Sequence, residues 1–377
     1  MVKFLIGGSP CTHWSIAQRK ARETEPEGTG WELFKNYLIA KEKFQPDFFL
    51  YENNKSAAEQ IKAKIRAELD VNDGTLFGHG IGRYIEINSA LVSAQNRNRF
   101  YVHNCGEVFL PEDRGILLQD ILQDDDCGET IADRAKADCF RATYDKCGRR
   151  NFEQNIIRAK GYQGVPVRVG CLPNAKGEVK ENQSKRVYSV EGKARALNAC
   201  TASGGSSDLS APHTGLYAYM TGKRKSTHPI YKVQNRQIEI SGNRYSMDLP
   251  DGYYIIRKLT VTEACRLQTL PDNYCRAVSE TSAYRGLGNG WTAEVIIHIL
   301  SHALAGIPKD EEIVILSMYD GIGTGRYCFD KLGYRNIRYF AYEIEKPAIE
   351  IAKTNFPDIV QCGDAFSVRE AGWSVPL

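Results

Sequence analysis

The chain contains eleven cysteines, yet no two of them stand in a C-x-x-C pair. That spacing is typical of zinc ribbons and thiol–disulfide motifs, so its absence argues against both. Scattered cysteines in a chain of this length also argue against a secreted disulfide scaffold. We therefore expect reduced thiols and a cytoplasmic protein.

Long apolar runs are also missing. The stretch Phe4 to Ile6 is too short for the apolar part of a signal peptide, and glycines and a proline follow it. The most apolar later stretch, 293–304, is interrupted by Glu294, His298 and His302. It is too short and too polar to cross a bilayer, so we expect no membrane partner.

The net charge is only +3, but it is unevenly distributed. Residues 141–260 contain 21 Lys and Arg against 9 Asp and Glu, a net charge of +12, which leaves −9 for the rest of the chain. A basic middle between acidic flanks favours a polyanion partner, although clustered lysines on a solvated surface would give the same count.

The pattern of apolar residues predicts an α/β protein. Across its 377 residues, 42% are hydrophobic, which suits a globular protein with one large domain and a smaller one. Strands alternate with helices in the first and last thirds, as in a mostly parallel sheet. The expected strands are 3–6, 47–51, 82–88, 99–103, 313–317, 339–342 and 359–361, and the expected helices are 30–43, 56–69, 262–268 and 292–305. Residues 126–250 differ, with short β-like runs at 186–190 and 230–240.

Three strand ends in the last 65 residues indicate a nucleoside site. The strand 313–317 leads into Tyr319-Asp320-Gly321-Ile322-Gly323-Thr324-Gly325. Glycines between a strand and a helix let the backbone approach a nucleoside closely. Glu343 ends the next strand, where an acid suits a ribose diol, and Asp364 follows the third, where a carboxylate can accept from an exocyclic amine. No Gly-Lys-Ser/Thr follows, so an adenosyl ligand is expected rather than a phosphate cradle.

A single thiol follows the first strand. Cys11 stands directly after Ser9-Pro10, where a strand gives way to a loop. A free cysteine is more often a small buried hydrophobic residue than a nucleophile. Glu52 and a pair of arginines, Arg97 and Arg99, are expected at the same edge of the sheet. A thiol, a carboxyl group and two arginines beside an adenosyl site favour methyl transfer to an electron-poor ring.

These blocks together resemble the motifs of the cytosine-5 DNA methyltransferases. The resemblance extends to both ends of the chain. Its blocks are Gly8-Ser9-Pro10-Cys11 (nucleophile motif), Glu52-Asn53 (E-N-V), Gln95 to Arg99 (Q-x-R-x-R), Arg257 to Gln268 (R-x-L-T-x-x-E-x-x-R-L-Q), Gly288 to Trp291 (G-N-x) and Tyr319 to Gly325 (cofactor glycine motif). Two motifs differ from the family at single positions or pairs. Asn54 stands where the E-N-V motif has valine, and Gly290-Trp291 replaces the usual Ser-Val.

The order of the motifs is rotated relative to the usual family member. There the cofactor glycine motif comes first and the G-N-x block last, whereas here the nucleophile motif comes first. The sequence therefore resembles a circular permutant cut just before the catalytic strand. Some motif residues, such as Asp320-Gly321-Ile322 and Gly290-Trp291, are similar to those of the de novo class of eukaryotic DNA methyltransferases. No chromatin-reading segment accompanies them.

The resemblance implies a Rossmann-like, S-adenosylmethionine-dependent fold with a smaller, mostly β or irregular target-recognition domain. It implies the domains 1–125 (catalytic, first part), 126–250 (target recognition) and 251–377 (catalytic, cofactor-binding part). As a DNA (cytosine-5-)-methyltransferase the chain would act on double-stranded DNA, in a bacterial or phage setting at the nucleoid. A companion restriction enzyme would be a natural partner. Neither the DNA site nor the oligomeric state can be read from the sequence.

The resemblance also assigns roles to residues. Cys11 would attack carbon 6 of cytosine, Glu52 would share a proton with ring nitrogen 3, Arg97 would hold the base carbonyl and Arg99 would fix the loop and neighbouring carboxylates. Ser9, Pro10 and Asn53 would line the base. The implied cofactor residues are Asp320, Gly321, Ile322, Gly323, Thr324, Gly325, Glu343, Ile344, Asp364, Ala365, Asn289 and Trp291.

Other readings stay open at this point. An RNA cytosine methyltransferase would share the chemistry, and an inactive DNA-binding homologue would share the fold, although the latter has no need of Cys11, Glu52 and Arg97 together. His298 and His302 are four residues apart, but no glutamate follows His298, so no metal site is expected. Glu263 and Arg266 are three apart on a predicted helix, where a structural pair is expected.

Overall fold

The computed structural model describes the following residues: 1–10, 13–15, 22–71, 80–123, 168–173, 177–179, 186–190, 192–195, 216–220, 230–257 and 259–375. Cys11 and much of the expected recognition domain lie outside them. Among the helices of the described residues, none has the length and apolar character needed to cross a bilayer.

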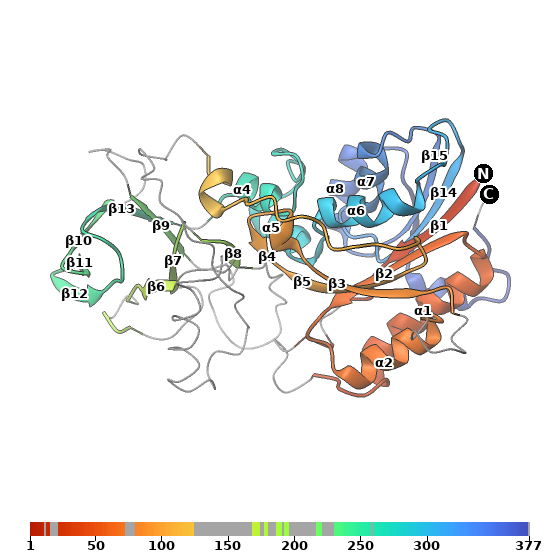
Figure 1. Cartoon of the computed structure of the whole chain (residues 1–377), viewed down its shortest axis with the longest axis horizontal. Helices are drawn as coiled ribbons and strands as arrows, with labels where there is room; N and C mark the ends of the chain where they lie inside the picture. Colours follow the sequence, from red (N-terminus) through yellow and green to blue (C-terminus); the bar gives the residue numbers. More distant parts are fainter. Residues whose placement is uncertain are drawn as a thin grey trace.

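A seven-stranded sheet forms the larger part of the structure (Figure 1). In spatial order its strands are β16 (Val360–Gly363), β15 (Ile337–Tyr342), β14 (Ile313–Met318), β1 (Val2–Gly7), β2 (Phe48–Asn54), β5 (Asn98–His103) and β3 (Arg83–Asn88). The pairs from β16 to β2 are parallel, and β5 is antiparallel to both of its neighbours. The first strand of the chain thus lies mid-sheet, between β14 and β2.

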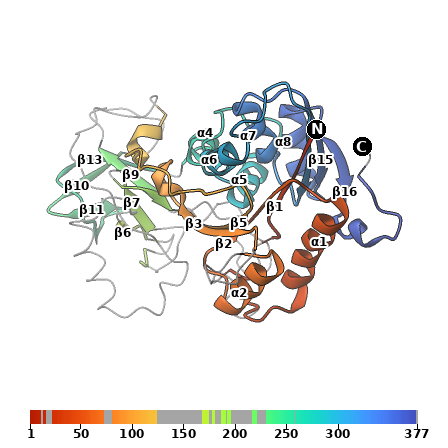
Figure 2. The same cartoon turned by 45° about the vertical axis from the view of Figure 1, so that its right-hand side comes forward.

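Helices cover both faces of this sheet, as Figures 1 and 2 show from two directions. Successive side chains of a strand point to opposite faces, so Phe4 and Ile6 of β1 enter one apolar cluster and Leu5 the other. The Leu5 face is covered by α1 (Gly28–Phe44), α2 (Glu59–Glu68) and the short 3₁₀ helix η5 (Ala365–Arg369). The Phe4 face is covered by α4 (Val261–Leu267), α5 (Glu280–Asn289), α6 (Ala293–Ala303), α7 (Thr324–Lys331) and α8 (Lys346–Asn355).

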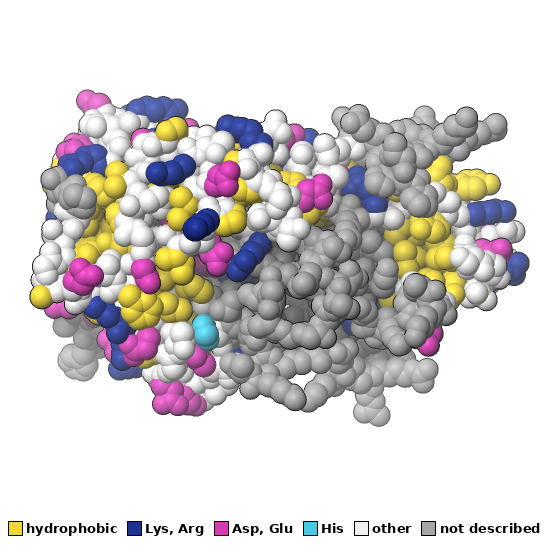
Figure 3. Space-filling view, turned by 180° about the vertical axis from the view of Figure 1, so that it is seen from behind, with side chains coloured by type: hydrophobic (Ala, Val, Ile, Leu, Met, Phe, Trp, Pro, Cys, Tyr) yellow, Lys and Arg dark blue, Asp and Glu magenta, His cyan; other side chains and the backbone are white. Residues whose placement is uncertain are grey.

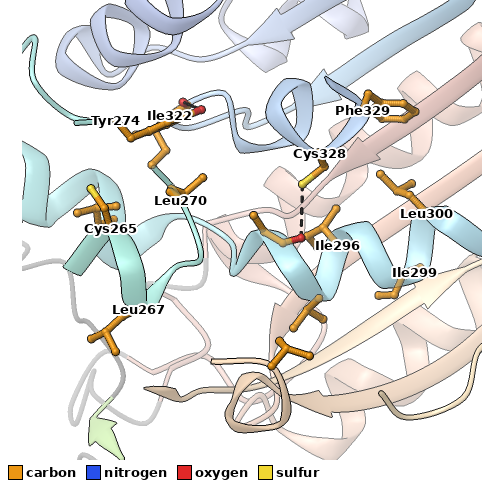
Figure 4. Close-up of a cluster of buried hydrophobic side chains, with 14 of the residues drawn as sticks. Cys265, Leu267, Leu270, Tyr274, Ile296, Ile299, Leu300, Ile322, Cys328 and Phe329 are labelled. Carbon is orange, nitrogen blue, oxygen red and sulfur yellow. Dashed lines mark hydrogen bonds between the residues drawn. The ribbon is translucent and has the colours of Figure 1, made fainter. Parts of the chain in front are cut away.

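The apolar cluster on the Phe4 face joins the helices to one another (Figure 4). Along α6 the buried apolar side chains recur with helical spacing and include Ile296, Ile299 and Leu300. The Cys328 thiol of α7 donates to the Ala293 carbonyl at the start of α6, at 3.6 Å. Cys328 is therefore a core residue that fixes α7 against α6.

A second seven-stranded sheet lies beside the first along the long axis of the molecule (Figure 1). Its strands, in order, are β12 (Asn243–Ser246), β11 (Gln237–Ile240), β10 (Ile230–Gln234), β13 (Gly252–Arg257), β9 (Leu216–Met220), β7 (Arg186–Ser189) and β6 (Arg168–Cys171). A two-stranded parallel pair, β4 (Gln95–Asn96) with β8 (Ala194–Arg195), connects this region to the catalytic segments. The fold class predicted from the sequence is confirmed: a mixed, mostly parallel α/β sheet with a smaller β-rich unit.

A few boundaries differ from those expected. Strand β2 runs to Asn54 rather than ending at 51, so Glu52 and Asn53 lie within the strand. The run 230–240 is a hairpin, because Asn235 and Arg236 both adopt positive φ, 51° and 56°, at its turn. The second sheet also includes β13, which begins after the boundary expected at 250.

Figure 3 shows one face of the molecule. Over the part that contains the larger sheet, positive and negative side chains are interspersed on this face. Most of the lysines and arginines that make 141–260 basic lie outside the described residues. The polyanion surface expected from that segment therefore stays a prediction.

Candidate active site

The expected site residues gather at one edge of the larger sheet. Parallel strands end at the same edge, so the segments that follow β1, β14, β15 and β16 meet there with the end of β2. Glu52 lies near the end of β2, and Asp320, Glu343 and Asp364 follow β14, β15 and β16. The structure thus brings together segments that are more than 300 residues apart in the chain.

Glu52 has a donor on each carboxylate oxygen. Arg99 Nε lies 3.0 Å from Oε1, and the indole Nε1 of Trp291 donates to Oε2 at 3.1 Å. The side chains of Glu52 and Arg99 are each only 12% exposed. Charge-assisted bonds in such a sheltered place orient a carboxylate strongly.

The turn that leads to Cys11 packs directly on Glu52. A β-carbon placed on Gly8 would lie 2.4 Å from the Glu52 carbonyl oxygen and 3.0 Å from Oε2, so only glycine permits this approach. The next residue, Ser9, is buried, and its hydroxyl lies 2.7 Å from the Tyr51 hydroxyl. Cys11 itself lies outside the described residues, two positions beyond Ser9.

Ser9 and Asn53 bind each other rather than an open site. The amide of Asn53, which is 1% exposed, donates to the Ser9 carbonyl at 2.9 Å. Both were expected to line the base, but their polar groups hold the backbone that leads to Cys11. Pro10, in contrast, is exposed.

The two arginines of the Q-x-R-x-R block have different surroundings. Arg97 is 3% exposed and donates through one nitrogen to the carbonyls of Gly288 (3.1 Å) and Gly290 (2.9 Å). One nitrogen of its guanidinium group thus supports the turn before Trp291, and the role expected for Arg97, holding the base carbonyl, stays a prediction. Arg99 contacts the neighbouring carboxylate Glu52, the kind of partner that the sequence predicted for it.

Asp320 has a buried carboxylate in the loop after β14. The hydroxyls of Ser317 and Tyr339 donate to Oδ1 at 2.7 and 2.6 Å. Oδ2 is buried and has no hydrogen-bond partner in the part of the chain that the structure describes. Burial raises the pKa of Asp320 to about 6, and the hydroxyl donors oppose that rise only in part.

Glu343 and Asp364 fix the neighbouring loops. Glu343 accepts from the Gly321 amide through Oε2 at 2.9 Å and from the Ile344 and Glu345 amides through Oε1 at 2.8 Å each. A carboxylate has about four acceptor positions, so one remains for a ligand hydroxyl. Asp364 is exposed, and its Oδ1 caps η5 by accepting from the Phe366 amide.

Several residues expected at the cofactor have other surroundings. The Ile322 side chain is 1% exposed and packs in the core near Tyr274 (Figure 4), so only its backbone remains for a ligand. A β-carbon on Gly325 would lie 2.5 Å from Ile6 Cδ1, which makes Gly325 a packing residue between α7 and the sheet. Ala365 is buried in the core as well. Ile344, by contrast, is 65% exposed.

The remaining groups fit an adenosyl ligand with a cationic end. Besides Asp320 Oδ2, the buried hydroxyl of Thr324 has no hydrogen-bond partner among the described residues. At Gly321 and Gly363 a β-carbon would meet nothing within 4 Å, so the backbone there borders open space. Asn289 is exposed at the end of α5. Unpaired buried acceptors beside open backbone are what a hydroxyl- and ammonium-bearing ligand requires.

Sequence reasoning did not identify the partners of these groups. Tyr339 and Ser317 hold Asp320 but were taken only as strand residues, and strand alternation alone does not show a hydroxyl that points to a loop. The pair expected between Glu263 and Arg266 was wrong. Glu263 instead binds Arg257 through two bonds of 2.7 and 2.8 Å, and Arg266 binds Asp272.

The two histidines of α6 contact each other. The rings of His298 and His302 lie 5.3 Å apart, and His298 Nε2 bonds to the Phe109 carbonyl. Within the described residues no group of three or more His, Cys, Asp or Glu side chains could hold a metal ion.

Comparisons with known proteins bear on this geometry. A family model described as C-5 cytosine-specific DNA methylase matches residues 1–304. Among curated proteins none matches the chain. Among solved structures, the chain is similar to a protein from E. coli that is named, provisionally, as a DNA modification methyltransferase encoded within a prophage. The identity is 17%, the match covers 80% of this chain and 79% of the other, and the TM-score is 0.37.

Proposed function

The chain belongs to the C-5 cytosine-specific DNA methylase family, and from this premise we propose that it methylates carbon 5 of a flipped-out cytosine in double-stranded DNA. The observation that carries the proposal is the Glu52 carboxylate, held by Arg99 and Trp291 against the turn that leads to Cys11. A cytosine in a stacked duplex cannot reach this edge of the sheet, so the base must leave the helix.

In the proposed reaction Cys11 is the nucleophile. Its thiolate adds to carbon 6, the ring loses its aromaticity, and carbon 5 becomes able to attack a methyl group. Glu52 shares a proton with nitrogen 3 and so takes up the charge that develops on the ring. After methylation a base removes the carbon 5 proton, the sulfur–carbon 6 bond breaks and the double bond re-forms.

The surrounding side chains orient these two groups. Arg99 lies beside Glu52 and would face the base with it, whereas Arg97 supports the turn that carries Trp291. Ser9 and Asn53 fix the backbone on the amino side of Cys11. We therefore propose a base contact for Arg99, in addition to the one expected for Arg97.

S-adenosylmethionine supplies the methyl group when it is bound. Asp320 would face its cationic methionine end, and the remaining acceptor position of Glu343 would take a ribose hydroxyl. Asp364 would accept from the adenine amine, with Asn289 and the exposed Ile344 at the rim. With these contacts the methyl donor would lie beside the end of β1, where the turn to Cys11 begins.

We further propose that the chain is a circular permutant of the usual family member. Support comes from the sheet, in which the last three strands of the chain, β14 to β16, continue the order outward from β1. The family match ends at 304, before those strands begin. The domains are proposed as expected, with recognition by 126–250 and with β13 completing the second sheet.

Nucleoside analysis tests the proposed function. We expect DNA from cells that express the chain to contain 5-methylcytosine, and bisulfite sequencing to place it in one short recurring sequence. The Cys11→Ala variant should leave that DNA unmodified because the nucleophile is gone. If 5-methylcytosine appears in RNA and not in DNA, the substrate assignment is wrong, and if neither carries it, the enzymatic assignment is wrong.

A further inference from the structure

The contact between Trp291 and Glu52 joins two distant parts of the chain. Trp291 follows α5, and its indole Nε1 lies 3.1 Å from Glu52 Oε2 on β2. The resemblance to the family placed Trp291 at the cofactor. In the structure its only polar atom, the indole N–H, instead donates to the proposed proton-sharing carboxylate.

Two buried side chains, those of Arg97 and Gln268, hold the turn that presents Trp291. Arg97 binds the carbonyls of Gly288 and Gly290. Gln268 donates to the Leu287 carbonyl and accepts from the Thr292 hydroxyl at 2.9 Å. A side chain carried by a backbone fixed on both flanks loses little further freedom when it binds a partner.

In this contact Trp291 can only be the hydrogen-bond donor. An indole N–H can donate but not accept, so Glu52 Oε2 must be the acceptor in this contact. Arg99 takes the other oxygen in the same way. The two donors together restrain rotation of the carboxyl group and leave a free acceptor position on each oxygen.

We propose that Trp291 is a positioning residue for Glu52, and this inference rests on the proposed function. The indole sets the plane of the carboxyl group that must meet nitrogen 3 of the cytosine. Besides Trp291, the charged or titratable described residues that face Glu52 are Arg99, Tyr51 and Tyr101. Among the described residues, Arg99 and Trp291 are the ones whose side chains bond to its carboxylate oxygens.

A double-mutant cycle tests the inference. Trp291→Phe and Glu52→Ala are made singly and together, and the single-turnover rate of 5-methylcytosine formation is measured at saturating DNA and S-adenosylmethionine. If the indole acts through the carboxylate, W291F slows the native enzyme about tenfold, as the loss of one hydrogen bond implies. In the E52A background, where no acceptor remains at position 52, W291F should change the rate by less than about twofold.

Two further variants sharpen the result. Trp373→Phe is the matched control, because it also removes an indole N–H, which donates to the Tyr342 hydroxyl. Tyr342 is on β15, which is separated from β2 by β14 and β1. The Trp373→Phe variant should have the same small effect in both backgrounds. A second variant carries 3-benzothienylalanine at position 291, which keeps the ring shape and replaces N–H by sulfur, so it remains informative if W291F folds poorly.

The outcomes separate the inference from the function on which it rests. Equal slowing by W291F in both backgrounds would overturn the positioning role, as would a native rate in the benzothienyl variant. Weaker S-adenosylmethionine binding by W291F with an unchanged transfer rate would place Trp291 at the cofactor and overturn it too. If the native chain forms no 5-methylcytosine at all, the proposed function fails first.

Discussion

Asp320 combines burial, two hydroxyl donors and an unpaired oxygen in one side chain. Its carboxylate lies in the loop after β14, and burial raises its pKa to about 6. If Asp320 faces the cationic end of the cofactor, as we propose, protonation would remove the attracting charge and this pKa would link pH to cofactor binding. The ionised form would bind the cation, so affinity should be present above pH 6 and decline as the pH falls through that value.

Calorimetric titration with S-adenosylmethionine measures this effect. We expect the dissociation constant to rise by up to about tenfold per pH unit below pH 6 and to be nearly constant above pH 7. Asp320→Asn should bind weakly at every pH, with little pH dependence. Asp358→Asn, which alters an exposed partner of Arg326, is the control and should keep the native profile. A native profile in D320N would contradict the account.

The residue scale also shows where sequence patterns were sufficient. The motif blocks located Glu52 and Asp320 correctly at one edge of the sheet, because parallel strands end together. They did not show which groups each side chain contacts. The division of roles between Arg97 and Arg99 depends on whether the Gly288–Gly290 carbonyls lie within reach, and that is a matter of tertiary packing.

Helix α4 is the element that connects the two sheets. Thr260 caps it, and Glu263 returns a bond to the Thr260 amide as in a capping box. Glu263 is 0% exposed and also binds Arg257 of β13 through both oxygens. Although burial opposes ionisation, the Arg257 guanidinium holds the pKa of Glu263 below its usual value.

Glu263→Gln should therefore destabilise the protein. It leaves the buried charge of Arg257 without its counter-ion, and we expect a loss of about 3 kcal/mol in the free energy of unfolding at pH 7, measured in urea. The pKa of Glu263 is lower in the folded state than in the unfolded state. The stabilisation that its ionised carboxylate provides is therefore complete above the unfolded-state pKa and is lost as the pH falls through the folded-state pKa. The difference between native protein and variant should shrink in the same direction.

The matched control is Asp272→Asn, which makes the same chemical change in an exposed Arg266 pair. Exposed pairs contribute about 0 to 1 kcal/mol, so this variant should stay close to the native protein. Similar losses in E263Q and D272N would show that burial of the Arg257–Glu263 pair has no special weight.

The sequence predicted the positions of the helices and strands better than it predicted the contacts between them. The continuous apolar run in β1 and the helical spacing in α6 both arise from burial, so the pattern of apolar residues located these elements within a few residues. Strand β2 extended further than expected because Glu52 and Asn53 pair with Tyr101 and Phe100 of β5. Polar residues at a strand end give no local signal of such pairing.

On the scale of the whole molecule, the chain order and the sheet order differ. The turn 306–310 joins α6 to β14, and Gly306 there adopts a φ of 89°. Val375, the last described residue, packs in the same apolar cluster as Leu5 of β1. Rejoining the chain near its ends and opening it at the turn would thus preserve the described contacts of both sheets.

A rotated chain tests this arrangement. Residue 377 is linked to residue 1 through a few glycines, and the chain is opened before Pro308. We expect a folded protein that methylates the same DNA sequence, since only loop entropy changes, by about 1 to 2 kcal/mol. A control opened between Ile315 and Leu316, inside buried β14, should not fold. An insoluble Pro308 variant beside a soluble native protein would contradict the proposed permutation.

Covalent trapping tests the central claim, that Cys11 adds to a cytosine in DNA, most directly. A duplex carries 5-fluorocytosine at the site found by bisulfite sequencing, and it is incubated with the protein and S-adenosylmethionine. Because fluorine cannot leave as a proton does, we predict a denaturant-resistant adduct whose peptide map places the DNA on Cys11. Cys362→Ala should still form it, and Cys11→Ala should not. No adduct with the native protein, or an adduct on another residue, would contradict the account.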